Sequence, residues 1–173
     1  MKKDARSGVF IGLGANLPHP QYGLPRQTLE AALAELGRRG VTLAGLSPWY
    51  RTAPVPASDQ PWYVNAVAEI GTDLSADRLL RVLHEVEEMF GRVRSVANAA
   101  RRIDLDLLDF DGEMAPEEAG KATLPHPRLA GRAFVLLPLA DLAPDWRHPG
   151  TGTPIKALVA ALPEGQIIER LTF

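Results

Sequence analysis

Two aspartates alternate with aliphatic residues in the segment RRIDLDLLDF, residues 101–110. In an extended chain successive side chains point to opposite faces, so Asp104 and Asp106 share one face and the intervening leucines the other. At the rise of a strand the two Cα atoms are about 6.6 Å apart, which lets both carboxylates reach one hard cation or bridge two. The alternative is a half-exposed strand whose polar face meets only solvent.

Four arginines fall within eleven residues upstream of the two aspartates: Arg92, Arg94, Arg101 and Arg102. Arginines beside paired carboxylates suit polyphosphate chemistry, because carboxylates can hold Mg²⁺ while guanidinium groups bind the remaining phosphate oxygens through paired hydrogen bonds. The alternative is a network of Arg–Asp ion pairs that binds no ligand. Since the chain carries a formal net charge of −2, any basic site must be local.

A second basic cluster lies in LPHPRLAGRAF, residues 124–134, which places His126, Arg128 and Arg132 near an expected helix start. Together with Lys121 upstream, these side chains are candidate phosphate contacts. A lone histidine more often has a structural or surface role, so His126 gains its interest from the neighbouring cations.

Aromatic residues gather in YRTAPVPASDQPWYVNA, residues 50–66, and beyond it. Four of them are candidates for a flat slot that would hold a ring: Tyr50, Trp62, Tyr63 and Phe134. Asn65 could read the edge of a heterocycle in such a slot. By strand alternation Tyr63, and not Trp62, shares the face of Asn65.

The glycines of GLGAN, residues 12–16, invite a nucleotide-binding interpretation. The segment fails the dinucleotide fingerprint because Leu17 stands where a third glycine belongs, and the sequence contains no Walker GKS/T motif. A tight turn after a first strand is the simpler interpretation.

Hydrophobic periodicity across the first 110 residues predicts the order strand, helix, strand, strand, helix, strand. The strands are expected at 9–16, where the strand runs into the glycine turn, and at 41–52, 62–72 and 102–110, and the helices are expected at 26–39 and 75–90. This order predicts the α+β class, with a ferredoxin-like βαββαβ core and an antiparallel sheet. C-terminal additions follow: a helix around 131–142, a short helix at 154–162 and a last strand at 166–173.

Length and composition limit the classes of protein to which the chain can belong. The 173 residues are expected to form one domain, 1–173, with residues 1–8 as a flexible N-terminus. The absence of cysteine excludes disulfides, thiolate metal sites and a cysteine nucleophile, and favours a reducing compartment. The N-terminus is a poor match to a signal peptide, and no stretch approaches the ~20 apolar residues of a membrane helix. We therefore expect a cytoplasmic protein without nucleic-acid or membrane partners, whereas protein partners stay undetermined.

Several motifs, in order, resemble the 6-hydroxymethyl-7,8-dihydropterin pyrophosphokinase family of folate biosynthesis: IGLGANL, YRTAPV, DQPWYVNA, GRVR, RRIDLDLLDF and LPHPRLAGRAFVLLPL. The resemblance extends from about Val9 to Leu162. It implies transfer of the β,γ-pyrophosphoryl unit of ATP to the hydroxymethyl group of the pterin, with release of AMP and with two Mg²⁺ ions.

The same resemblance implies roles for individual residues. Four are implied to act in catalysis, with the two aspartates holding both metal ions: Arg92, Arg101, Asp104 and Asp106. The implied contacts of ATP are Glu87, Arg92, Arg94, Arg101, Leu107, Lys121, Thr123, His126 and Arg132. The implied contacts of the pterin are Thr52, Pro54, Val55, Tyr63, Asn65 and Phe134.

One segment departs from the family pattern. SVANAARR, residues 95–102, stands where many members carry Arg-Trp-Gly-Pro-Arg in a loop that closes over the substrates. Closure of this lid is therefore expected to differ, and Arg101 and Arg102 are both candidates for the family arginine. No dedicated general base is evident, so Asp106 or bulk water is expected to take the proton of the metal-activated hydroxymethyl group.

Two functions without catalysis are alternatives, because the same element order serves RNA-binding and regulatory ligand-binding modules. The third expected strand, WYVNAVAEI, lacks the aromatic segment of RNA-binding modules, and carboxylates on the fourth strand would repel phosphate unless metal ions intervened. A regulatory module does not require the cluster of arginines and aspartates.

Overall fold

The computed structural model describes residues 8–92, 100 and 102–172. Within these residues, six strands form one sheet in the order β5-β1-β4-β3-β6, and β2 also pairs with β4. Every pair of neighbouring strands is antiparallel. The strands are β1 (Val9–Ala15), β2 (Thr42–Leu46), β3 (Tyr50–Thr52), β4 (Tyr63–Gly71), β5 (Asp104–Phe110) and β6 (Ile168–Arg170).

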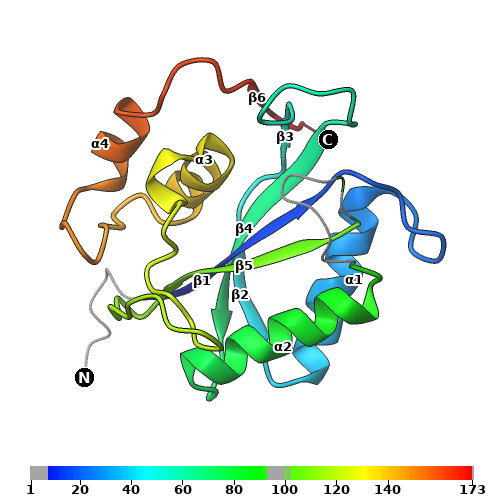
Figure 1. Cartoon of the computed structure of the whole chain (residues 1–173), viewed down its shortest axis with the longest axis horizontal. Helices are drawn as coiled ribbons and strands as arrows, with labels where there is room; N and C mark the ends of the chain where they lie inside the picture. The colour runs from blue at the N-terminus through cyan, green and yellow to red at the C-terminus, as the bar shows by residue number, and fades with distance from the viewer. Residues whose placement is uncertain (1–7, 93–99, 101, 173) are drawn as a thin grey trace.

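The predicted ferredoxin-like core is confirmed. Helices α1 (Pro25–Arg38) and α2 (Ala76–Met89) follow β1 and β4, and together they cover one face of the sheet (Figure 1). The other face packs against α3 (Ala133–Leu142), which follows the 3-10 turn η1 (Leu129–Gly131), and α4 (Ile155–Ala160) packs on α3. No helix in the described ranges is both long and apolar enough to span a membrane.

Each face of the sheet has its own hydrophobic core. Leu29 of α1 and Leu79 and Leu83 of α2 pack on one face, and all three side chains are fully buried. On the other face, Leu136 of α3 and Trp146 pack against Phe10 and neighbouring strand residues. The periodic leucines of the sequence therefore anchor the helices that flank the sheet.

The expected strand 41–52 is two strands, β2 and β3, that both pair with β4. The interruption falls at 47–49, where Ser47 Oγ accepts a hydrogen bond from the backbone N–H of Val67 at 2.9 Å. Pro48 has no N–H to donate to a ladder, so regular pairing stops here and resumes at Tyr50.

Both ends of α2 carry residues that favour helix termini. Ser75 Oγ accepts a hydrogen bond from the N–H of Arg78 at 3.3 Å and so caps α2. Gly91, with φ of 87°, stands just beyond the end of this helix. The last strand is shorter than expected, since β6 covers only Ile168–Arg170.

The expected glycine turn after β1 is wrong. Gly12 and Gly14 lie inside β1, which pairs with β4 along one edge and β5 along the other through both positions. A Cβ atom at Gly14 would lie 2.9 Å from Oδ1 of Asn65. The segment GLGAN is therefore strand, and the missing side chain at Gly14 makes room for Asn65.

A bulge in β5 separates its aspartates into two groups. Phe10 pairs with Asp109 and Ile11 with Leu107, so one extra residue enters between them. Asp109 is buried and accepts hydrogen bonds from Trp146 Nε1 at 2.8 Å and from the N–H of Gly112 at 3.0 Å. The third carboxylate of the strand thus supports the core beneath α3.

The predicted flexible N-terminus, residues 1–8, falls almost entirely outside the described residues. Residues 1–7 are not described, and the carbonyl of Gly8 accepts a hydrogen bond from the N–H of Asp111 at 2.9 Å.

Candidate active site

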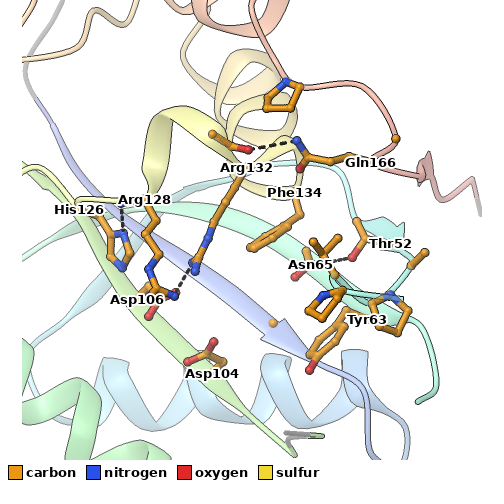
Figure 2. Close-up of a pocket in the computed structure, with 18 of the residues that line it drawn as sticks. Thr52, Tyr63, Asn65, Asp104, Asp106, His126, Arg128, Arg132, Phe134 and Gln166 are labelled. Carbon is orange, nitrogen blue, oxygen red and sulfur yellow. Dashed lines mark hydrogen bonds and ion pairs between the residues drawn. The ribbon is translucent and has the colours of Figure 1, made fainter. Parts of the chain in front are cut away.

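A cavity of about 870 Å³ lies between the sheet and the segment that leads into α3 (Figure 2). Its wall also includes the loop after β3 and a C-terminal segment, residues 163–166. Eleven residues selected from the sequence lie in this wall: Thr52, Pro54, Val55, Tyr63, Asn65, Asp104, Asp106, His126, Arg128, Arg132 and Phe134. Residues spread over more than 80 positions of the sequence therefore meet in one cavity.

Asp104 and Asp106 line the same cavity, as strand alternation predicts. Their side chains are 22% and 30% exposed. Burial and the neighbouring charge of Asp104 raise the pKa of Asp106 to about 7, although Arg132 acts in the opposite direction. The site therefore holds more negative charge than its environment neutralises, and a bound cation would relieve this excess.

The donor set at the two aspartates fits Mg²⁺. In the described ranges no group of three or more His, Cys, Asp or Glu side chains gathers to form a complete metal site. Mg²⁺ is commonly bound through one or two carboxylates together with substrate phosphates, because it gives up its waters reluctantly. The pair Asp104 and Asp106 supplies the protein part of such a site.

Arg92 links Asp104 to a buried carboxylate of α2. Its Nη1 donates to Asp104 Oδ1 at 2.8 Å and to Glu87 Oε2. Glu87 is fully buried and also accepts a hydrogen bond from the N–H of Leu105 at 2.9 Å. Burial opposes the charged form of Arg92, but Asp104 and Glu87 outweigh it and raise its pKa. The ion-pair network considered as an alternative thus exists, and it abuts the cavity.

Arg128 and Arg132 form the cationic side of the cavity wall, and His126 lies beside them (Figure 2). The backbone N–H of His126 donates to the carbonyl of Leu108 at 2.9 Å, which ties the segment to β5. His126 Nδ1 accepts from the N–H of Arg128 at 3.2 Å, and burial together with Arg132 lowers the pKa of His126 to about 4. A neutral ring that accepts at Nδ1 carries its proton on Nε2 and can donate from there.

Asn65 lies at the floor of the apolar half of the cavity. Its Nδ2 donates to Thr52 Oγ1 at 2.7 Å, and the side chains of Tyr63 and Phe134 stand nearby in the wall (Figure 2). The guanidinium carbon of Arg132 lies 5.3 Å from the centre of the Phe134 ring. A flat heterocycle would find hydrogen-bonding groups at one edge here and aromatic surface beside it.

Two of the four aromatic candidates do not line the cavity. The hydroxyl of Tyr50, which is buried, donates to Asp141 of α3. Trp62 is 37% exposed, with the guanidinium carbon of Arg51 at 4.8 Å from the centre of its ring. The slot is therefore formed by Tyr63 and Phe134.

Besides Glu87 and Arg92, three described residues that the resemblance implies for ATP do not line the cavity: Leu107, Lys121 and Thr123. Leu107 is 4% exposed and packs in the core beneath α1 and α2, so only its backbone could meet a ligand. Lys121 is an exposed residue whose Nζ lies 3.0 Å from Glu118 Oε1. Arg94, Arg101 and most of the SVANAARR segment lie outside the described residues.

The C-terminal wall was not found from the sequence. Its members are Pro163, Glu164, Gly165 and Gln166. The residues PEGQ carry a turn signal but no signal of a binding site, so only the tertiary structure brings them to the cavity.

Comparison with known proteins agrees with this geometry. The model of the family described as 7,8-dihydro-6-hydroxymethylpterin-pyrophosphokinase (HPPK) matches residues 10–144. The chain belongs to this family. It is 41% identical over 165 residues to the 2-amino-4-hydroxy-6-hydroxymethyldihydropteridine pyrophosphokinase of Pseudomonas aeruginosa, covering 94% of this chain and 96% of that protein. It is 38% identical to the enzyme of the same name from Synechocystis, covering 88% of this chain and 74% of that protein.

The fold is also that of solved HPPK domains. A crystal structure of wild-type HPPK-DHPS from Plasmodium falciparum with pteroate superposes with a TM-score of 0.65 at 13% identity. The match covers 89% of this chain and 44% of that longer chain. At this identity the likeness shows the fold, and the ferredoxin-like core of HPPK is the part that the two proteins share.

Proposed function

We propose that this HPPK transfers the pyrophosphoryl unit of ATP to 6-hydroxymethyl-7,8-dihydropterin, giving the pterin diphosphate and AMP. The observation that carries the proposal is the single cavity in which paired carboxylates and cations adjoin an aromatic, amide-lined half. Family membership and relatives whose matches cover most of both chains support the same reaction. Because those matches span nearly the full length, we also propose that the chain acts as one catalytic domain.

The cationic half of the cavity is the proposed site of the ATP phosphates. Arg132 and the neutral His126 face the same space as Asp104 and Asp106, so they can donate hydrogen bonds to phosphate oxygens there. Arg92 keeps Asp104 oriented from below through its 2.8 Å hydrogen bond. Arg94 and Arg101 are proposed as contacts of ATP on the family resemblance alone.

The other half of the cavity is the proposed pterin site. Asn65 and Thr52 present an amide and a hydroxyl that can pair with the polar edge of the ring, while Tyr63 and Phe134 offer aromatic surface. Pro54 and Val55 complete this side of the wall. Placing the ring here would direct its hydroxymethyl group toward the carboxylates, where the transfer takes place.

Asp104 and Asp106 are the proposed ligands of Mg²⁺, in two sites as the family resemblance implies. When bound, Mg²⁺ would supply a Lewis acid that screens the triphosphate and acidifies the attacking hydroxyl. The chain's own part is to hold the two carboxylates on one strand face and to orient the phosphates with Arg132 and His126. Asp106 or bulk water then accepts the proton of the hydroxymethyl group.

The non-catalytic alternatives find less support. RNA-binding modules with this element order read bases on an open sheet face, whereas here α3 packs against that face and buries Phe10 and Val67. A regulatory module gives no reason for the raised pKa of Asp106 beside Asp104.

The test is AMP formation from ATP and Mg²⁺ with and without 6-hydroxymethyl-7,8-dihydropterin. We expect AMP that depends on the pterin in the wild type and its loss by at least about 10³-fold in Asp104→Ala/Asp106→Ala. A folded wild-type protein that forms no pterin-dependent AMP would refute the proposed reaction.

A further inference from the structure

Helix α3 begins at an unusual cap. Its N-cap residue is Arg132, and arginine is not among the residue types that favour this position. The Arg132 side chain instead extends into the cavity toward Asp106, at 4.0 Å (Figure 2). The N–H groups of a first helical turn need acceptors from elsewhere when the cap residue is used in this way.

The acceptor comes from the far end of the chain. Gln166, 33 residues beyond Ala133, accepts a hydrogen bond from the N–H of Ala133 through its Oε1 at 2.9 Å. The same side chain donates from Nε2 to the carbonyl of Gly131 at 3.0 Å (Figure 2). One side-chain amide thus bonds to the peptide groups on both sides of Arg132 and fixes the backbone from which the guanidinium projects.

The segment that carries Gln166 is itself anchored to the opposite wall of the cavity. The carbonyl of Ile167 accepts a hydrogen bond from the N–H of Ala53 at 3.1 Å, and Ile168 pairs with Thr52 in the sheet. Residues 166–168 therefore join the wall that carries Thr52 to the wall that carries Arg132. Figure 2 shows Gln166 bonded to the segment that precedes Arg132.

We infer that Gln166 is a positioning residue, which holds Arg132 and Phe134 in the geometry needed for the proposed pyrophosphoryl transfer. The inference rests on the proposed function. Gln166 acts through the backbone of 131–133 and not through contact with the reacting atoms. Because a misplacement of about 1 Å can cost about 10²-fold in rate, loss of the amide is expected to lower kcat/KM about 10-fold or more.

A double-mutant cycle tests this coupling. Pterin-dependent AMP formation is measured for the wild type, Gln166→Ala, Arg132→Ala and the double variant, with melting temperatures alongside. If Gln166 works through Arg132, Gln166→Ala lowers kcat/KM about 10-fold in the wild type but less than about 3-fold in the Arg132→Ala background. If Gln166→Ala only loosened the fold, kcat/KM would fall by the same factor in both backgrounds. Equal losses would therefore overturn the inference.

Glu169→Ala is the matched control. Glu169 lies in the same C-terminal segment and pairs with Arg51 at the surface, away from the cavity. We expect its kinetic constants to stay within about 2-fold of the wild type, as for an exposed ion pair. A Gln166→Ala protein with the kinetics of Glu169→Ala would also overturn the inference.

A third variant keeps the test valid if Gln166→Ala does not fold. Gln166→Glu retains the acceptor for Ala133 but replaces the donor to Gly131 by a carboxylate oxygen that the Gly131 carbonyl repels, so a loss with the same dependence on Arg132 is expected. Absence of pterin-dependent AMP in both the wild type and Glu169→Ala would instead refute the proposed function, which distinguishes the two failures.

Discussion

Gly14 of β1 and Asn65 of β4 face each other so closely that a Cβ atom on Gly14 would lie 2.9 Å from Asn65 Oδ1. Asn65 also donates to Thr52 Oγ1 at 2.7 Å, so its amide is confined from two sides. The glycine is therefore part of what orients the amide at the floor of the cavity.

Gly14→Ala is expected to displace the Asn65 amide and to raise the KM for the pterin about 10-fold, with about 1–3 kcal/mol lost from the free energy of unfolding. The matched control is Gly12→Ala, whose Cβ would meet Leu108 at 3.5 Å, an ordinary contact distance. Steady-state kinetics and thermal unfolding of both variants check the prediction. An unchanged pterin KM in a folded Gly14→Ala protein would contradict it.

Removal of Arg92 is expected to destabilise the protein through Glu87. The Arg92 guanidinium contacts this fully buried carboxylate, so Arg92→Ala should cost about 3 kcal/mol of unfolding free energy. Glu87→Gln in the Arg92→Ala background removes the buried charge while keeping an oxygen to accept from Leu105. The double variant should therefore recover much of the stability, as measured by urea unfolding, whereas additive losses would speak against this role of the ion pair.

The Asp106 carboxylate is expected to lower the stability of the metal-free protein, although AMP formation requires it. Its pKa is raised from 3.8 to about 7, so the folded protein binds more protons than the unfolded chain between these values and loses stability as pH rises through them. Without Mg²⁺, Asp106→Asn should exceed the wild type by about 2 kcal/mol at pH 8, after allowance for solvent screening, and by much less at pH 4.

Asp106→Asn should at the same time lose pterin-dependent AMP formation. Thermal unfolding of both proteins from pH 4 to 8 measures the first effect, and the AMP assay measures the second. A variant that is less stable than the wild type at pH 8 would show that the Asp106 carboxylate is well compensated in the protein without metal.

His126 gives the opposite pH dependence. Its pKa is lowered from 6.5 to about 4, so the unfolded chain binds the proton first and stability falls as pH drops from 6.5 toward 4. His126→Gln cannot titrate and should reduce the loss of unfolding free energy over this range by about 2 kcal/mol. Chemical unfolding at pH 7 and pH 4.5 measures the difference, and parallel pH profiles for the two proteins would contradict the prediction.

Local patterns in the sequence determined the order of the secondary-structure elements, the shared face of the two aspartates and the family. Periodicity predicted the order of helices and strands, because it reports which face of each element is buried. The alternation around Asp104 and Asp106 predicted their shared face, since side chains on a strand alternate regardless of its neighbours. The order of several motifs identified the family.

Tertiary structure alone decided the features that depend on contacts between distant segments. Gly12 and Gly14 resemble a turn in the sequence, but pairing on both edges makes them strand. Leu107 and Lys121 lie close to the aspartates or histidine in sequence, yet packing and exposure place them outside the cavity wall. Gln166 bonds to Gly131 and Ala133, on either side of Arg132, only because β6 pairs with β3, and no local pattern encodes a contact that the packing of the whole chain creates.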